Sequence, residues 1–234
     1  HAIDNYWLMC LQTEEKILPA TVIRNEVKKR VKEIELTRGD KVGRKEKTQL
    51  TVFSDFRHGI FNPSSVQKLL KAIPKRNFKA GDSQVASRWG NITEFKNFDL
   101  ITPNEREARF SLADQDSTVG KLSAMLYDET KCKNLILKLG PRGVFCIDSG
   151  SRKRIPFSIG VFVENILDAV GAGDALLAYS SLSLKVSNSL IKAAIIGSLA
   201  ASCACEIEGN KPINIETIIN KIKQVEKKIN YIHK

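Results

Sequence analysis

One short glycine-containing bend, DAVGAGDA at residues 168–175, ends an extended apolar segment and opens a long helix rich in small residues. Gly171 and Gly173 allow a tight turn and carry no Cβ atoms that would obstruct a ligand. The free N–H groups of the first helical turn can then point at one negatively charged group, and the helix dipole adds to the attraction. Asp174, beside them, is placed to take a proton from a hydroxyl group. The bend therefore predicts an anion site with a general base, which phosphoryl transfer requires.

A structural role fits the same bend equally well, because Gly-x-Gly-Asp at a helix start is also a plain turn with a capping carboxylate. Two other glycine motifs are excluded. The third glycine of a dinucleotide-binding fingerprint would fall at Leu176, and the sequence contains no Gly-x-x-x-x-Gly-Lys-Ser/Thr. The bend alone therefore leaves both a turn and a phosphoryl-transfer site open.

The segment DAVGAGDALLAYSSL resembles the C-terminal signature of the ribokinase or PfkB carbohydrate kinase family, D-T-x-G-A-G-D followed by a small-residue helix. The resemblance implies that Asp174 is the catalytic base. It also implies that the amides of Gly171, Ala172 and Gly173 form the anion hole for the transferred phosphoryl group. The departures from the usual form remove neither a backbone donor nor the base; they are Ala169, Val170 and Leu176.

The composition limits which other classes of protein this chain can belong to. The 234 residues, 42% of them hydrophobic, can bury one substantial core. We find no apolar run of the ~18 residues that a membrane span needs and no secretory pattern at the N-terminus, so we expect a cytoplasmic protein with no membrane partner. The five cysteines are odd in number and scattered, and the close pair Cys203-x-Cys205 is interpreted as small packing residues rather than a metal site.

The charge is strongly basic and unevenly distributed. The net charge of +11 favours anionic ligands. Residues 24–49 hold ten Lys or Arg against five Asp or Glu, without interleaved aromatic residues for base stacking. We interpret this stretch as a solvated basic segment, and nucleic-acid binding is a less favoured alternative.

From residue 50 onwards strand and helix patterns alternate. LTVFSD at residues 50–55 is a short run of β-forming residues, and Asn62 followed by Pro63 predicts a capped helix start. The helix that follows, at residues 64–73, carries its apolar residues on one face. This order predicts a parallel sheet with its ligand at the carboxyl ends of the strands.

Together with the resemblance, this order implies an α/β fold of ribokinase type, in which helices flank a mainly parallel central sheet in three layers. We expect it to be N-terminally truncated, because family members carry a preceding segment with much of the sugar pocket and a lid. The kinase domain is expected at residues 50–234. Residues 1–49 are interpreted as an atypical basic remnant of the substrate and lid region.

Two strand ends carry candidate substrate ligands. DFRHG at residues 55–59 is similar to the D-Y-x-K-G segment of the family branch that contains bacterial heptose-phosphate kinases. That similarity implies a substrate role for Asp55 and His58, with Arg57 as an alternative source of positive charge. Asp82 resembles the aspartate at the next strand end in these kinases. A capping aspartate before a turn is the structural alternative.

The stretch TPNERE at residues 102–107 supplies a candidate metal site. Asn104 and Glu107 are three residues apart, so they share one helix face, where an amide oxygen and a carboxylate can hold the water shell of Mg²⁺. The same two residues also form the pattern of a capping box. In the family, an N-x-x-E motif at this place shapes the magnesium and phosphate site, which favours ATP and Mg²⁺ and leaves a monovalent cation open.

Two further loops are candidate nucleotide neighbours. The sequence LGPRG at residues 139–143 follows a strong strand pattern and resembles the family's L-G-x-x-G turn beside the nucleotide. The resemblance implies ATP contacts for Lys138, Gly140 and Gly143, although a turn that needs glycine explains them equally well. The loop with Asn210 follows the second small-residue helix, where the family encloses adenine.

Four motifs in the same order as in the family, each at a strand-to-loop junction, indicate an ATP-dependent kinase of sugars or sugar phosphates nearest the heptose-phosphate kinase branch. The alternative is a catalytically silent nucleotide-binding or interaction module derived from a truncated kinase. A homodimer is left open, and the sequence does not identify the sugar or the hydroxyl group.

Overall fold

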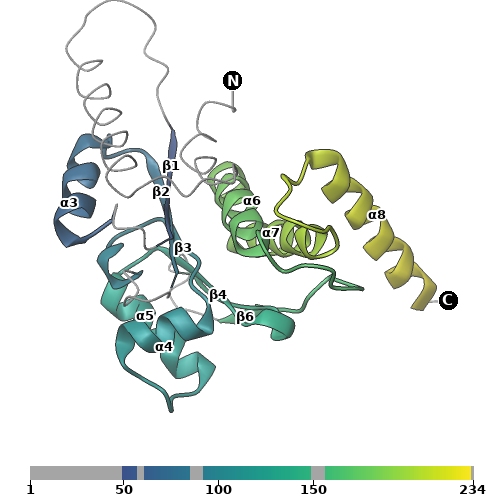
Figure 1. Cartoon of the computed structure of the whole chain (residues 1–234), viewed down its shortest axis with the longest axis horizontal. Helices are drawn as coiled ribbons and strands as arrows, with labels where there is room; N and C mark the ends of the chain where they lie inside the picture. Colours follow the sequence, from purple (N-terminus) through teal and green to yellow (C-terminus); the bar gives the residue numbers. More distant parts are fainter. Residues whose placement is uncertain (1–48, 57–60, 85–91, 149–155, 233–234) are drawn as a thin grey trace, which may run out of the picture.

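A six-stranded sheet lies between helices that pack on both of its faces (Figure 1). The structure is a computed structural model that describes residues 49–56, 61–84, 92–148 and 156–232. The strands are β1 (Leu50–Asp55), β2 (Phe78–Ser83), β3 (Leu100–Ile101), β4 (Asn134–Lys138), β5 (Val144–Asp148) and β6 (Phe157–Ile159). They lie side by side in chain order. β1 to β4 are parallel, β5 is antiparallel to β4, and β6 is antiparallel to β5.

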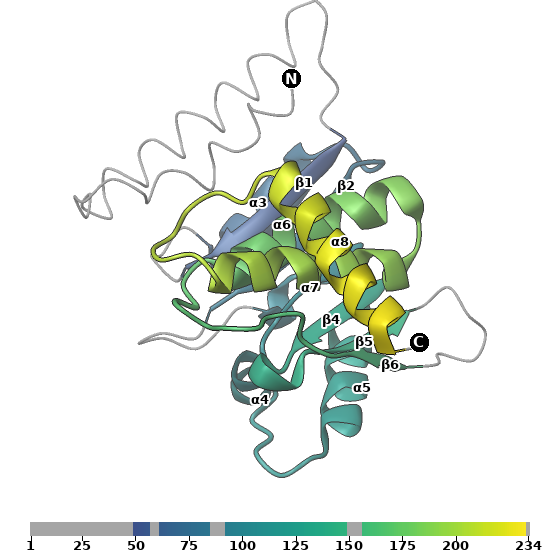
Figure 2. The ribbon, with the colours of Figure 1, turned by 90° about the vertical axis from the view of Figure 1, so that its right-hand side faces the viewer.

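Two layers of helices cover the sheet (Figure 2). One layer consists of α3 (Pro63–Ala72), α4 (Glu105–Leu112) and α5 (Val119–Thr130). The other consists of α6 (Ala172–Ser187) and α7 (Leu190–Cys205), and α8 (Ile215–Ile232) packs against α7 on the side away from the sheet. Short 3₁₀ turns, η2 (Ile92–Glu94) and η3 (Gly140–Arg142), complete the order. The predicted three-layer α/β architecture with a mainly parallel sheet is therefore confirmed.

The local signals explain where the elements begin. Asn62 caps α3 by accepting a hydrogen bond from the Ser65 amide at 2.9 Å, and Pro63 occupies the first helical turn, as the sequence predicts. Between β4 and β5 the chain turns through η3, and Gly143 has a φ of +81°. A Cβ atom at Gly143 would collide with the backbone carbonyl of Ile159 on β6, so this position needs glycine for packing as well as for its dihedral.

An aromatic cluster fills the core beneath α3 and α5. Phe53, Phe95 and Phe98 pack with ring centroids 5.1–5.9 Å apart, and all three are buried. Gly81 on β2 makes room for them, because a Cβ atom there would lie 2.7 Å from Phe95 Cδ2. The cluster thereby fixes the distance between β1 and β2 and this helical layer.

Small residues let α6 and α7 of the other helical layer pack closely against each other. Gly197 on α7 faces α6, where a Cβ atom would lie 3.0 Å from Ser180 Cβ. The core on this side joins Leu100 and Ile136 of the sheet to Leu177 and Ala194 of the two helices. This close packing holds the start of α6 against the carboxyl ends of the parallel strands.

Among the described residues, none of the helices combines the length and the apolarity that crossing a membrane requires.

We expect Phe98→Ala to lower the free energy of unfolding by about 3–5 kcal/mol, because it leaves a cavity in the aromatic cluster. Urea unfolding followed by circular dichroism measures the change. Val186→Ala is the control, since Val186 is 87% exposed and its truncation is expected to change stability by about 0.5 kcal/mol or less. Equal effects of the two substitutions would contradict the assignment of the core.

Candidate active site

Polar side chains form a row at the carboxyl ends of the parallel strands, on the sheet face that α6 covers. Ser54 and Asp82 are register partners at the ends of β1 and β2. Thr102 follows β3, and Lys138 ends β4. Since alternate strand residues share a face, these four lie on the same side as Val52, Ala80, Leu100 and Ile136, which pack against α6 and α7. The row comes from positions far apart in the sequence.

A buried ion pair joins two members of this row. Lys138 Nζ lies 2.6 Å from Asp82 Oδ2, and the two side chains are only 16% and 8% exposed. Burial alone would lower the pKa of the Lys138 ammonium, but the carboxylates of Asp82, Glu107 and Asp174 together raise it. Lys138 is thus held in its charged form by three acids.

Asp174, the predicted base, faces this row. It lies in the first turn of α6 and accepts a hydrogen bond from the Ser54 side chain. Burial raises the pKa of its carboxyl group, and the neighbouring Asp82 charge raises it further, against the lowering effect of Lys138. A raised pKa improves a carboxylate as a proton acceptor. The side chain therefore faces the row, and its role as the base stays a prediction.

The bend before α6 has the backbone form that an anion site needs. Gly171 is the N-cap residue with a φ of +82°, which favours glycine. The Ala172 amide donates to the Ala169 carbonyl at 3.3 Å, a long hydrogen bond within the turn. The amides of Gly173 and Asp174 belong to the first helical turn, where an α-helix offers no acceptor. The structure thus adds the Asp174 amide to the three amides expected from the sequence.

Asp168 is a site residue to which the sequence analysis gave no role. Its Oδ1 accepts from the Val170 amide at 2.9 Å, and its Oδ2 accepts from the Gly209 amide at 3.2 Å. These bonds tie the bend to the loop after α7. The predicted adenine neighbour Asn210 lies in that loop, and its side chain occupies the space that a Cβ atom at Gly171 would need. An aspartate that bonds two residues ahead is a recognisable turn signal, but its bond to a loop 41 residues away is not.

Asn104 and Glu107 form the capping box that the sequence left as one of two interpretations. Glu107 accepts from the Asn104 backbone and side-chain amides at 2.6 Å each, and the Glu107 amide donates to Asn104 Oδ1 at 2.8 Å. Glu107 is buried, and burial raises its pKa to about 7, with Lys138 acting in the opposite direction. The box holds a carboxyl group beside the row.

The same pair also fits Mg²⁺ chemically. Carboxylate and amide oxygens are the ligands that this ion prefers, and an oxygen that accepts one hydrogen bond keeps a second lone pair. Because Glu107 is only 3% exposed, contact through the ion's water shell on the Asn104 side fits better than direct coordination. We find no group of three His, Cys, Asp or Glu side chains that could hold a metal ion by protein ligands alone within the described residues 49–56, 61–84, 92–148 and 156–232.

A groove of about 420 Å³ opens between the start of α4 and the η3 turn. Three of the predicted nucleotide neighbours line it: Asn104, Lys138 and Gly140. Gly143, which was predicted from the same stretch as Lys138 and Gly140, packs against β6 and does not line the groove. The groove and the bend meet at Lys138, because a Cβ atom at Gly173 would lie 3.3 Å from Lys138 Nζ.

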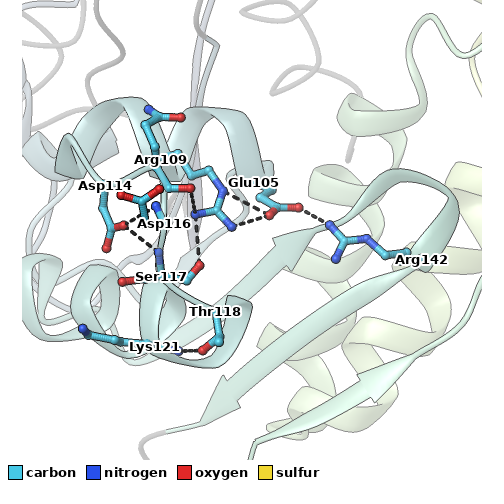
Figure 3. Close-up of polar contacts among 9 residues, drawn as sticks. Glu105, Arg109, Asp114, Asp116, Ser117, Thr118, Lys121 and Arg142 are labelled. Atoms are coloured by element: carbon cyan, nitrogen blue, oxygen red, sulfur yellow. Dashed lines mark hydrogen bonds and ion pairs between the residues drawn. The ribbon is translucent and has the colours of Figure 1, made fainter.

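Ion pairs fix the outer wall of this groove (Figure 3). The Glu105 carboxylate accepts from Arg109 at 2.7 Å and also from Arg142 of the η3 turn. The Arg109 guanidinium donates further to the carbonyls of Gln115 and Ser117 at 3.2 and 3.1 Å. Glu105 therefore joins the first turn of α4, the loop after α4 and the β4–β5 turn into one rigid wall.

The predicted substrate ligands are only partly brought together. Asp82 lies in the row beside Asp174. Asp55 ends β1 with its side chain on the opposite face from Ser54, buried, and its Oδ2 accepts from Ser83 Oγ at 3.1 Å. The Asp55 side chain thus lies on the opposite face of the sheet from Asp174, which does not favour a substrate role for it. His58 and Arg57 lie outside the described residues.

Comparisons with known proteins identify a family for most of this chain. A family model described as "pfkB family carbohydrate kinase" matches residues 44–217. The bifunctional protein HldE of Desulfatibacillum aliphaticivorans is 26% identical over 157 residues, which are 65% of this chain and 30% of that protein. The chain therefore spans about a third of the length of this curated relative.

Solved structures share the fold at low identity. Phosphofructokinase-2 from Escherichia coli in complex with potassium superposes with a TM-score of 0.66 at 19% identity, covering 87% of this chain and 62% of that one. Ribokinase from Arabidopsis thaliana, complexed with ribose and ATP, gives 0.64 at 18% identity, covering 82% and 59%. At such identities the likeness establishes the ribokinase-like fold.

The N-terminal stretch matches a different family. A model described as "Putative exonuclease, RdgC" matches residues 1–52. The recombination-associated protein RdgC of Cupriavidus pinatubonensis is 44% identical over 50 residues, 21% of this chain and 17% of that protein. The interpretation of residues 1–49 as a remnant of a substrate and lid region stays a prediction, and residues 1–48 lie outside the described part of the chain.

The raised pKa of Glu107 predicts a pH-dependent stability. Between the ordinary value of 4.5 and about 7, the folded state keeps a proton that the unfolded state has released. The free energy of unfolding therefore falls as the pH rises through this window, on the order of 1–3 kcal/mol from this group. Glu107→Gln should remove this part of the slope in urea unfolding between pH 5 and 7.5 without divalent ions.

Only the slope with pH is compared, because the substitution also changes the capping box. Glu216→Gln at an exposed position is the matched control and should leave the wild-type slope unchanged. A slope in Glu107→Gln that equals the wild-type slope would refute the assignment of a raised pKa to Glu107.

Proposed function

The chain belongs to the pfkB family of carbohydrate kinases, and we propose that it transfers a phosphoryl group from ATP to a hydroxyl group of a sugar or sugar phosphate. The observation that carries this proposal is the placement of Asp174. Its carboxyl group, with a raised pKa, lies in the first turn of α6, whose Gly173 and Asp174 amides have no helical acceptor, and near the groove between α4 and η3. A base next to an anion hole is the arrangement that in-line phosphoryl transfer uses.

The chain's own groups have separate tasks in this mechanism. Asp174 accepts the proton of the attacking hydroxyl group, and Ser54 orients the carboxyl group by donating a hydrogen bond to it. The amides of Gly171, Ala172, Gly173 and Asp174 bind the phosphoryl oxygens as their charge redistributes. Asp168 keeps those amides in place through its bonds to Val170 and Gly209.

The nucleotide is proposed to lie along the groove, with Asn104, Lys138 and Gly140 beside its phosphates and Asn210 on the adenine side. Asn104 and Glu107 would hold Mg²⁺ through its water shell, and the bound ion would neutralise phosphate charge. The E. coli structure named above contains potassium. For this chain, a monovalent cation stays a prediction.

A sugar phosphate is the substrate class that we favour. HldE proteins of two bacteria match 65% and 77% of this chain, and the sequence resembles the heptose-phosphate kinase branch. Asp82 and His58 are the proposed substrate neighbours, with Asp55 less favoured because it faces the other side of the sheet. We propose a cytoplasmic location with these small-molecule partners, and a homodimer stays a prediction.

The competing proposal is a catalytically silent nucleotide-binding or interaction module. It draws on one observation, that the chain spans 62% of the solved E. coli kinase chain and 30% of the HldE relative. ATP binding without turnover over a panel of sugars and sugar phosphates would favour it.

Asp174→Asn is expected to retain ATP binding and to lower kcat for sugar phosphorylation by about 10²–10⁴-fold, because the amide cannot accept the proton. Coupled-enzyme detection of ADP measures turnover, and calorimetry measures ATP binding. Asp116→Asn, a change of the same chemistry at an exposed position, is expected to retain wild-type turnover. Normal turnover by Asp174→Asn would show that another group is the base.

A further inference from the structure

Lys138 lies at the junction of the two halves of the site. As the last residue of β4, it lines the groove between α4 and η3. Its Nζ is also 3.3 Å from the point that a Cβ atom would occupy on Gly173, so the ammonium group is in contact with the α6 bend. A phosphate chain that runs from the groove to the bend has to pass this group.

The side chains around Lys138 are acidic, so an anion binds at these strand ends only if the Lys138 ammonium group contacts it. Asp82, Glu107 and Asp174 surround the ammonium group, and each of them raises its pKa. Three carboxyl groups against one cation make the strand ends repel an incoming polyphosphate. Arg109 and Arg142 both already donate to Glu105 at the outer wall. Within the described part of the chain, Lys138 is the cation that touches both the groove and the bend.

Asp82 is a counter-ion that Lys138 can leave. The pair is made by one oxygen, Oδ2, while Oδ1 accepts from the Ser83 amide at 3.1 Å. Lysine is a point charge on a flexible four-carbon stem, so its ammonium group can turn from one acceptor to another without moving the strand.

A spare donor lies beside Asp82. Thr102 follows β3 next to Asp82 and is fully buried, and its Oγ1 has no hydrogen-bond partner among the described residues. A buried hydroxyl group without a partner is costly. Such a group is explained if it donates to Asp82 whenever Lys138 turns away, so that the carboxylate keeps a hydrogen bond although it loses its counter-ion.

On this basis, and resting on the proposed kinase function, we propose that Lys138 exchanges Asp82 for the terminal phosphate of ATP. In this arrangement the ammonium group contacts the phosphoryl group beside the Gly173 amide, and Thr102 takes over part of the Asp82 carboxylate. Asp82 then acts as the resting partner of Lys138, in addition to any contact with the sugar. The terminal phosphate is the part of the nucleotide that ADP lacks, so the proposal concerns discrimination between ATP and ADP.

Binding of MgATP and MgADP to the full chain, measured by calorimetry, tests the exchange. Lys138→Met is expected to weaken ATP binding by about 10–100-fold and to change ADP binding much less, because it removes one charge-assisted contact to the terminal phosphate. Lys138→Arg keeps the charge and is expected to recover part of the preference for ATP.

A second pair of variants separates this role from a purely structural ion pair. Lys138→Met alone leaves Asp82 buried without its partner, which can prevent folding. The double variant Lys138→Met with Asp82→Asn removes both charges and is expected to fold and still lose the preference for ATP. Asp82→Asn alone frees Lys138 and is expected to bind ATP at least as tightly as the wild type.

The outcomes are distinct. A double variant that prefers ATP over ADP as strongly as the wild type overturns the proposal, and so does a wild-type chain without such a preference. A wild-type chain that binds ATP selectively but phosphorylates no sugar refutes the proposed kinase function, while the comparison of variants still supports or overturns the role of Lys138. A wild-type chain that binds neither nucleotide overturns both.

Discussion

The buried pair of Lys138 and Asp82 is the interaction on which the strand ends depend. Three carboxyl groups, those of Asp82, Glu107 and Asp174, converge at one edge of the sheet, and a single ammonium group makes their proximity tolerable. Burial alone would disfavour any charge at this place. The pair also joins β2 to β4 across the two-residue strand β3, which by itself gives few backbone hydrogen bonds to hold this edge.

The packing on the two sheet faces explains why these groups meet. On one face, Gly81 leaves room for the rings of Phe95 and Phe98, and this packing fixes the distance of β1 and β2 from the helices above them. On the other, small residues bring α6 against the strands, so that its first turn ends beside Ser54 and Lys138. Parallel strands direct all their carboxyl ends to one edge, and the α6 bend closes that edge.

The chain joins sequence resemblances to two different families. The pfkB match begins at residue 44 and the RdgC match ends at residue 52, so the two overlap just before and within β1. The strong basic charge of residues 24–49 falls in the RdgC part. The features from which a kinase function is proposed, the α6 bend, the capping box and the η3 turn, all lie in the pfkB part.

The sequence by itself determined the family, the three-layer fold, the positions of Asn104 and Lys138 near strand ends and that of Asp174 at a helix start. These features depend on local patterns: apolar periodicity, caps and glycine turns. The motif alone favoured a capping box for Asn104 and Glu107, and the family resemblance implied a magnesium site. The structure shows the box, and the metal site stays a prediction. The sequence by itself assigned no role to Asp168 and treated Asp55 and Asp82 alike. Only the tertiary structure decided that Asp82 pairs with Lys138 while Asp55 faces the other side. The alternation of side chains along a strand separates Asp55 from Ser54, and an ion pair between residues 56 positions apart has no local signal in the sequence.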